Sequence, residues 1–249
     1  MLGLPDGITA CLLDLDGVLT RTAKVHAAAW KQMFDEYLHA RADKTGEPFR
    51  EFEIEHDYEE YVDGKPRYDG VRSFLASRHI ELPEGSPSDP RDAETVCGLG
   101  NRKNDLVLKL IHDQGVEAYE GSIRYVKAAR DAGLRRAVVS SSANTRDVLV
   151  AAGIEDLFEA RIDAKVADEQ HLKGKPAPDT FLAGARALGV PPAHAAVFED
   201  AVAGVQAGHD GEFGYVVGVD RVGHGHADAL RSHGANVVVE DLSELIADR

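Results

Sequence analysis

The stretch with the most chemical information lies near the N-terminus, where residues 8–20 read ITACLLDLDGVLT. An apolar run over residues 8–13 has the length and the bulky side chains of a buried strand, and it leads into Asp14, Asp16 and Gly17. Side chains two residues apart on a strand share a face, so both carboxylates leave the strand end in one direction. Two like charges at this spacing repel unless a cation, a proton or an electrophile lies between them. The pair therefore predicts a site for Mg²⁺, which proteins bind through one or two carboxylates together with substrate phosphate oxygens.

This acidic pair has two other interpretations. An EF-hand loop needs a further Asp or Asn at position 18 and a glycine at position 19, and this chain has Val18 and Leu19 there, which excludes it. A turn of ordinary surface aspartates stays open on this stretch alone. It is weakened because residues that can handle phosphate recur at the ends of later predicted strands.

Two such residues are a serine and a lysine. Ser140 follows a predicted strand over residues 136–139, and its hydroxyl and backbone N–H can hold a phosphate oxygen at the start of a helix. The alternative role for Ser140 is a helix N-cap. Lys175, in the segment KGKPAPDTF, precedes a proline-led helix start, where its ammonium group can neutralise both Asp14 and a phosphate. The alternative for Lys175 is an exposed loop lysine.

A second acidic pair, Glu199 and Asp200, follows the apolar segment over residues 195–198. Together with Asp14, these carboxylates can complete the ligand shell of a magnesium ion. The alternative is an acidic pair in the first turn of a helix, where it would interact with the helix dipole.

The composition limits the classes of protein. The 249 residues carry a net charge of −15, which argues against a nucleic-acid binder acting through a basic face. Cys11 and Cys97 lie far apart in the sequence, so a disulfide framework is not expected and a reducing compartment is favoured. The N-terminus lacks a basic start followed by a long apolar segment, and no later run has the length of a membrane span. These features predict a cytoplasmic protein without nucleic-acid or membrane partners, and they leave a monomeric state open.

The order of elements predicts an α/β fold with a helical insertion. The stretch between residue 22 and about residue 114 reads as helical throughout, with helices expected over residues 22–40, 47–62, 68–79 and 91–113. Beyond it, strands alternate with helices; the strands are expected over residues 136–139, 160–164, 195–198, 213–219 and 236–239, and the intervening helices include 122–132, 178–188 and 201–209. This alternation implies a parallel sheet with helices on both faces. Right-handed crossovers place the carboxyl ends of all strands at one edge, where ligands bind.

Taken together, the four blocks resemble the haloacid dehalogenase superfamily of phosphotransferases. The blocks are DLDGVLT at residues 14–20, Ser140, Lys175 and the pair Glu199-Asp200, in the order typical of that family. The resemblance implies a Rossmann-like three-layer core with a parallel sheet, formed by residues 1–21 and 115–249. It also implies an α-helical cap domain inserted over residues 22–114, in agreement with the helical pattern of that stretch.

Within this superfamily the chain is most similar to the β-phosphoglucomutase branch. The similarity rests on TAxxH at residues 22–26, GKPR at residues 64–67, RKND at residues 102–105, SxSxN at residues 140–144 and KPAPDTF at residues 175–181. The sequence departs from the family pattern at Arg21 and Ala143, where relatives often carry an acidic and a basic residue respectively. The residues implied to bind substrate are Thr22, His26, Trp30, Gly64, Arg67, Lys103, Asn104, Ser142 and Asn144.

The resemblance also implies a catalytic mechanism. Asp14 is the expected nucleophile, which forms an aspartyl-phosphate, and Asp16 the general acid and base. Ser140 and Lys175 hold the phosphoryl oxygens as they gain charge. The magnesium ligands are expected to be Asp14, the Asp16 backbone carbonyl, Glu199 and Asp200. Arg67 would contact a second phosphate, while His26, Lys103 and Asn104 contact the sugar or shape the cap face; a helix-surface position for His26 and solvated charges at Arg67 and Lys103 are the alternatives.

Three functions fit this set of residues. The favoured one is a mutase that interconverts β-D-glucose 1-phosphate and glucose 6-phosphate through a glucose 1,6-bisphosphate intermediate. The second is a Mg²⁺-dependent phosphatase for small sugar phosphates, in which water resolves the aspartyl-phosphate. The third is a non-catalytic sugar-phosphate sensor, and the complete set of charged residues argues against it.

Overall fold

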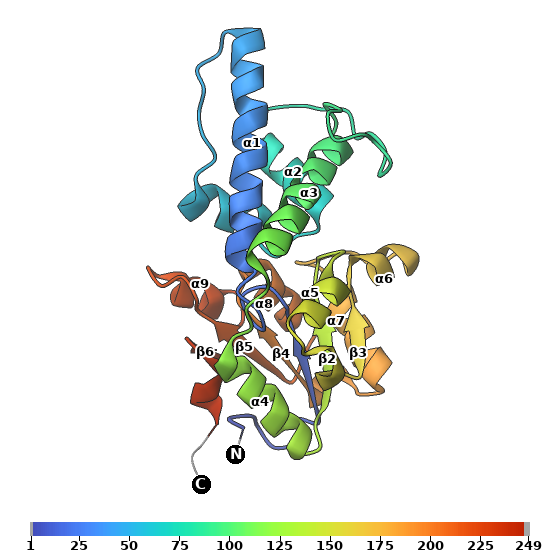
Figure 1. Cartoon of the computed structure of the whole chain (residues 1–249). Coiled ribbons are helices and arrows are strands. Elements are labelled where there is room, and N and C mark those ends of the chain that lie inside the picture. Colours follow the sequence, from blue (N-terminus) through green and yellow to red (C-terminus); the bar gives the residue numbers. More distant parts are fainter. Residues whose placement is uncertain (1, 247–249) are drawn as a thin grey trace. The chain divides into compact units, whose positions relative to one another are not determined.

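The computed structural model describes residues 2–246 and divides into two compact units (Figure 1). Unit 1 comprises Met1–Arg21, Gly64–Pro66 and Val116–Arg249, and unit 2 comprises Thr22–Asp63 and Arg67–Gly115. The short segment Gly64–Pro66 thus groups with unit 1, whereas the sequence analysis assigned it to the helical insertion. Within the described residues, no helix is both long enough and apolar enough to cross a membrane.

Unit 1 is organised around a parallel sheet, as the sequence predicted. Over the described residues the sheet has six strands in the order β3-β2-β1-β4-β5-β6, and every neighbouring pair is parallel. The strands are β1 (Ala10–Leu13), β2 (Arg135–Val139), β3 (Ala160–Ile162), β4 (Ala195–Glu199), β5 (Tyr215–Val219) and β6 (Val237–Val239). The central position of β1 places the residues that follow it between the ends of β2 and β4.

Helices pack against both faces of this sheet. They are α4 (Glu120–Asp131), α5 (Thr145–Ala151), α6 (Ala164–Glu169), α7 (Asp179–Leu188), α8 (Val202–Asp210) and α9 (His226–Ser232). Leu12 points to one face, where its side chain lies so close to Gly184 of α7 that a Cβ there would be 2.6 Å from Leu12 Cδ2. Phe198 points to the opposite face and contacts Tyr125 of α4, with the ring centroids 5.3 Å apart. Burial on both faces explains why the strands are continuous apolar runs.

Unit 2 is helical and contains α1 (Ala23–Thr45), a π-helical segment (Ile54–Val62), α2 (Arg67–Ser77) and α3 (Val96–Gln114). Its core is aromatic: the ring of Phe34 lies 5.3 Å from Trp30, 5.3 Å from Phe52 and 4.1 Å from Phe74, between centroids. Such pairs add to the free energy gained by burying the rings. Three helices and the π-helical segment therefore enclose one hydrophobic core.

Three predicted helix boundaries in unit 2 were wrong. The first helix ends at Thr45 rather than at residue 40, and Gly46 in the left-handed conformation is its C-cap. Residues 47–53 are not helical, because α1 side chains bind the backbone of Phe52: its N–H donates to Asp35 at 2.7 Å, and its carbonyl accepts from Lys31 at 2.9 Å. The last helix begins at Val96 rather than at residue 91, because Thr95 is the N-cap and accepts a hydrogen bond from the Gly98 N–H at 2.9 Å.

Candidate active site

A buried lysine lies between two carboxylates at the carboxyl edge of the sheet. The ammonium of Lys175 donates to Asp14 Oδ1 and to Glu199 Oε1, each at 2.5 Å, and to the Val139 carbonyl at 3.2 Å. Only 2% of Lys175 is exposed, which excludes the alternative of a solvated loop lysine. The Lys175–Pro176 peptide bond is cis. The Lys175 side chain thus contacts residues at the ends of three strands: Asp14 after β1, Val139 in β2 and Glu199 in β4.

The second acidic pair completes a group of three carboxylates. One oxygen from each of Asp14, Glu199 and Asp200 lies within 4.8 Å of the others. Helix α8 begins at Val202 and has no acidic residue in its first turn, so the pair precedes the helix, and the Glu199 carboxylate accepts a hydrogen bond from the Ala201 N–H at 2.8 Å. Three carboxylates facing a single lysine leave an excess of negative charge, and oxygen donors are the ligands that Mg²⁺ prefers. The residues therefore fit a divalent cation.

A tight turn shapes the loop that follows β1. The Gly17 N–H donates to the Thr20 carbonyl at 2.8 Å, and the Thr20 N–H donates to the Leu15 carbonyl at 2.9 Å. Gly17 has a φ of +87°, in the left-handed region that favours glycine. This turn holds Asp16, which is half-buried, close after Asp14 on the chain. β1 ends at Leu13, so both aspartates follow the strand and neither is part of it.

Ser140 directly follows β2 and is 3% exposed. Its hydroxyl accepts a hydrogen bond from the Ser142 N–H at 3.1 Å, and its own N–H donates to the Ile162 carbonyl at 2.9 Å. Helix α5 begins at Thr145 with Asn144 as its N-cap, so Ser140 is not the cap. The Ser142 hydroxyl accepts from the Asn144 N–H at 3.2 Å, which orders the loop between the strand and the helix.

Burial dominates the electrostatics of the site. It raises the pKa of Asp14 well above its usual range; Lys175 opposes this shift, whereas Glu199 and Asp16 add to it. For Lys175, burial alone would lower the pKa, but the carboxylates of Asp14 and Glu199 raise it above its usual value. Lys175 is therefore charged over the whole physiological range, and it is the group that favours the ionised form of Asp14.

Two residues beyond β5, neither of them predicted from the sequence, contact the candidate site. Arg221 donates from Nε to the Gly17 carbonyl at 2.9 Å, and its guanidinium lies 3.7 Å from the centroid of the Tyr119 ring. His226 Nε2 is 2.7 Å from the Asp200 carbonyl, so this nitrogen carries the proton and donates it. The signal that could have found them is their position after the strand predicted over residues 213–219, which ends at the same edge of the sheet.

Several of the predicted substrate-binding residues lie together in unit 2. Lys103 Nζ is 2.8 Å from His26 Nδ1 and 4.6 Å from the centroid of the Trp30 ring. Lys103 is 5% exposed and Trp30 is 2% exposed, so Lys103 is not a solvated charge and Trp30 is part of the aromatic core. Because His26 contacts the buried Lys103 ammonium, it is not simply a residue on the helix surface.

The other predicted substrate-binding residues are distributed over both units. Arg67 begins α2, where its guanidinium donates to the Tyr68 hydroxyl at 3.0 Å. Thr22 is the N-cap of α1, and Asn104 follows Lys103 on α3. The carbonyl of Gly64, grouped with unit 1, accepts a hydrogen bond from the Ser141 hydroxyl at 2.7 Å.

Comparisons with known proteins identify relatives along the whole chain. The chain is 58% identical over 247 residues to the β-phosphoglucomutase of Mycobacterium bovis, covering 99% of this chain and 94% of that protein. It is 29% identical over 236 residues to the β-phosphoglucomutase of Bacillus subtilis, covering 95% and 91% of the two chains. Among solved structures, β-phosphoglucomutase from Clostridium difficile matches with a TM-score of 0.74 and 26% identity, covering 96% of this chain and 93% of that one.

A family model described as haloacid dehalogenase-like hydrolase matches residues 8–211. The matched region runs from the predicted first strand to the end of α8 and includes all four sequence blocks. Together with the relatives, this match shows that the chain belongs to the haloacid dehalogenase-like hydrolase family.

Proposed function

We propose that this protein is a Mg²⁺-dependent phosphoglucomutase that interconverts β-D-glucose 1-phosphate and glucose 6-phosphate. The observation that carries the proposal is the buried Lys175, with Nζ at 2.5 Å from both Asp14 and Glu199, in a chain 58% identical to a mycobacterial β-phosphoglucomutase. Taking the three ionisable side chains of Asp14, Lys175 and Glu199 out of water costs free energy. A cluster with a purely structural role has no need of such buried charges. A phosphoryl-transfer site uses the same groups to balance the charge of a nucleophile, a phosphate and a cation.

In the proposed reaction, Asp14 is the nucleophile. One of its carboxylate oxygens attacks phosphorus of the sugar bisphosphate, the bond between phosphorus and the sugar oxygen breaks, and an aspartyl-phosphate forms. Asp16 gives a proton to the departing sugar oxygen. When a hydroxyl of the next sugar phosphate attacks the aspartyl-phosphate, Asp16 takes the proton of that hydroxyl. Atoms and charge balance over the cycle, and the enzyme ends as it began.

Lys175 and Ser140 would hold the phosphoryl oxygens. The Lys175 ammonium neutralises negative charge on Asp14 before the attack and on the transferring group during it. The Ser140 hydroxyl lies at the end of β2, the strand next to β1. Phosphoryl transfer requires additional positive charge. A bound magnesium ion would supply it, held by Asp14, the Asp16 carbonyl, Glu199 and Asp200.

The insertion would select a substrate with a second phosphate. Arg67 carries the guanidinium for that phosphate. Thr22, His26, Lys103 and Asn104 would contact the sugar, while the Trp30 ring packs against the Lys103 ammonium. The proposed substrates are small sugar phosphates, and a cytoplasmic location, inferred from the cysteine content, is part of the same proposal.

The test is incubation of the protein with β-glucose 1-phosphate, Mg²⁺ and a trace of glucose 1,6-bisphosphate, followed by phosphorus NMR. The proposal predicts a glucose 6-phosphate resonance that grows at the expense of the substrate. Dominant release of free phosphate would show a phosphatase instead, and no turnover would point to a sensor. The Asp14→Asn variant, measured in parallel, identifies any signal from a contaminating enzyme.

A further inference from the structure

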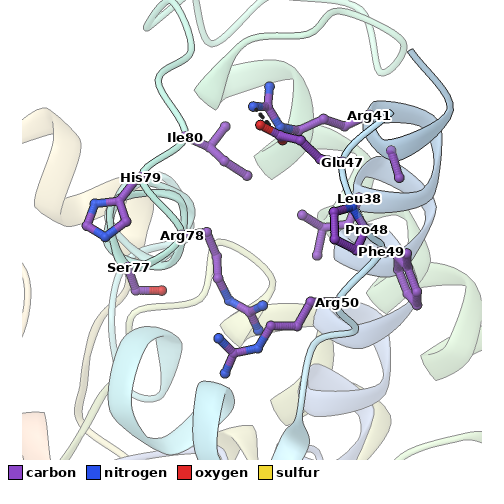
Figure 2. Close-up of a pocket in the computed structure, with 11 residues that line it drawn as sticks. Leu38, Arg41, Glu47, Pro48, Phe49, Arg50, Ser77, Arg78, His79 and Ile80 are labelled. Carbon is purple, nitrogen blue, oxygen red and sulfur yellow. Dashed lines mark hydrogen bonds and ion pairs between the residues drawn. The ribbon is translucent and has the colours of Figure 1, made fainter. Parts of the chain in front are cut away.

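Unit 2 contains a cavity of about 330 Å³ that the proposed chemistry does not use (Figure 2). It is formed by the C-terminal half of α1, the non-helical segment after α1 and the end of α2, with Leu38, Phe49 and Ile80 in its lining. All lining residues belong to unit 2, and none is in the four sequence blocks. The volume is at the lower end of the range for small-molecule pockets.

The lining of this pocket is basic in a chain with a net charge of −15. It contains Arg41, Arg50, Arg78 and His79, and among the described lining residues the one acid is Glu47. Glu47 is already paired with Arg41, with Oε2 3.2 Å from the guanidinium (Figure 2). A local concentration of positive charge on an acidic protein favours an anionic ligand.

Arg78 lines the pocket and is held by three contacts. Its guanidinium donates to Asp57 Oδ2 at 2.5 Å and to the Glu51 carbonyl at 3.0 Å, and it lies 5.0 Å from the centroid of the Phe74 ring. The Arg78 side chain is 9% exposed. A guanidinium fixed in this way presents its remaining N–H donors without further loss of side-chain entropy.

Arg50 supplies a second guanidinium at the same place. Across residues 2–246 its side chain makes neither an ion pair nor a hydrogen bond, and Figure 2 shows it pointing toward Arg78. Two guanidiniums that converge repel each other, and the Asp57 carboxylate balances one of the two charges. An anion bound between them would remove the repulsion and accept hydrogen bonds from both, as phosphate does at paired arginines.

Apolar side chains also line the pocket. Leu38, Pro48 and Ile80 line it together with Phe49, which is 39% exposed. The Phe49 ring is held by stacking on His39, with centroids 3.6 Å apart and an angle of 10° between the planes. A carbon skeleton attached to the anion would cover this exposed surface.

We propose that this pocket binds a small organic phosphate, with the phosphate group between Arg50 and Arg78 and the carbon skeleton on Leu38, Pro48, Phe49 and Ile80. The site is separate from the carboxylates and lysine of the candidate active site, since it is built from other residues. The proposal does not depend on the mutase activity.

The test uses the full ¹⁵N-labelled chain titrated with phenylphosphonate, whose carbon–phosphorus bond resists hydrolysis. Saturable shifts are expected for the backbone amides of residues 38–41, 49–50 and 77–80. Arg50→Gln should weaken this isotherm about tenfold or more, the effect of losing charged hydrogen bonds. Arg50 is exposed, and within residues 2–246 its side chain makes neither an ion pair nor a hydrogen bond. The variant should therefore retain the wild-type spectrum elsewhere. The amides of residues 140–142 report separately on any binding at the candidate active site.

Two controls make the result decisive. Arg124→Gln removes an arginine from α4, outside the pocket, and should leave the pocket isotherm unchanged. Benzyl alcohol presents a similar ring without the anion and should not saturate these amides. The proposal is overturned if the pocket amides do not respond to phenylphosphonate, if Arg50→Gln binds it as tightly as the wild type, or if benzyl alcohol produces the same saturable shifts.

Discussion

Gly17 and Asp200 occupy adjoining space so closely that a Cβ on Gly17 would lie 1.7 Å from Asp200 Oδ2. These residues follow β1 and β4, which are neighbours in the sheet. The absence of a side chain at Gly17 is therefore what permits the Asp200 carboxylate to approach the carboxyl end of β1. A similar relationship holds between Gly204 of α8 and Glu199, where a Cβ would lie 1.8 Å from Oε1.

Gly17→Ala is expected to displace the Asp200 carboxylate and to raise the Mg²⁺ concentration needed for half-maximal activity by about tenfold or more. The substitution should also lower the free energy of unfolding, in part because a φ of +87° costs about 1 kcal/mol for a residue with a side chain. Gly7→Ala is the matched control, because Gly7 has a φ of +92° and no described atom lies within 4 Å of the position that a Cβ would take there. Equal Mg²⁺ dependence in the two variants would contradict this explanation.

Asp14→Asn is expected to lower turnover by more than about 10⁴-fold, because an amide cannot act as the nucleophile. The change conserves volume and removes one of the buried negative charges around Lys175, so the midpoint of thermal unfolding should not fall appreciably. Turnover is measured by phosphorus NMR and unfolding by circular dichroism. Asp6→Asn, at an exposed position, is the control, and wild-type activity in Asp14→Asn would exclude this residue as the nucleophile.

Arg221→Gln is expected to reduce kcat about tenfold or more through the loop that carries Asp16. The substitution removes the hydrogen bond to the Gly17 carbonyl and the contact of the guanidinium with Tyr119. The loss of these contacts should also lower the free energy of unfolding by about 1–2 kcal/mol. Steady-state kinetics with separate kcat and KM values provide the measurement, with Arg124→Gln as the control. A change in stability with kcat intact would show that Arg221 has a structural role alone.

Asp57→Asn is expected to destabilise unit 2 by about 3 kcal/mol at neutral pH, because it leaves Arg78 without its buried carboxylate. Burial by itself would raise the pKa of Asp57, but hydrogen bonds from the Glu53 backbone and from Arg78 lower it below its usual value. A lowered pKa in the folded state means that the stabilisation is complete above the unfolded pKa of about 3.9 and is lost as the pH falls through the folded value.

The stability difference between wild type and Asp57→Asn should therefore be largest near pH 7 and shrink below about pH 4. Urea unfolding followed by the fluorescence of Trp30, the one tryptophan in the chain, reports on unit 2. Asp228→Asn removes a carboxylate from an exposed ion pair with Arg231 and should cost at most about 0.5 kcal/mol. A difference that is constant with pH would argue against an ionised Asp57.

The parallel sheet and its helices could be predicted because their signals are local. Apolar runs of four to five residues mark strands buried on both faces, as in β1 and β4, and the observed bounds of the predicted strands differ by only a few residues. Since parallel strands end at one edge, the residues after them were expected to lie together, and Lys175 does contact both Asp14 and Glu199. Helix starts in unit 2 were less predictable, because the backbone at Phe52 is bound by side chains of α1.

The family, the order of strands and helices and the identity of the charged residues that follow the strands can be inferred from the amino-acid sequence, because each depends on residue types and short spacings. The three-dimensional structure was needed to show that Ser140 is not a helix N-cap and that Lys175 is not a solvated lysine, since burial and pairing with residues far along the chain distinguish these roles. The contacts of Arg221 and His226 and the arginine pocket of unit 2 also needed the tertiary structure. Their partners are distant in sequence, and no local pattern specifies which of them meet.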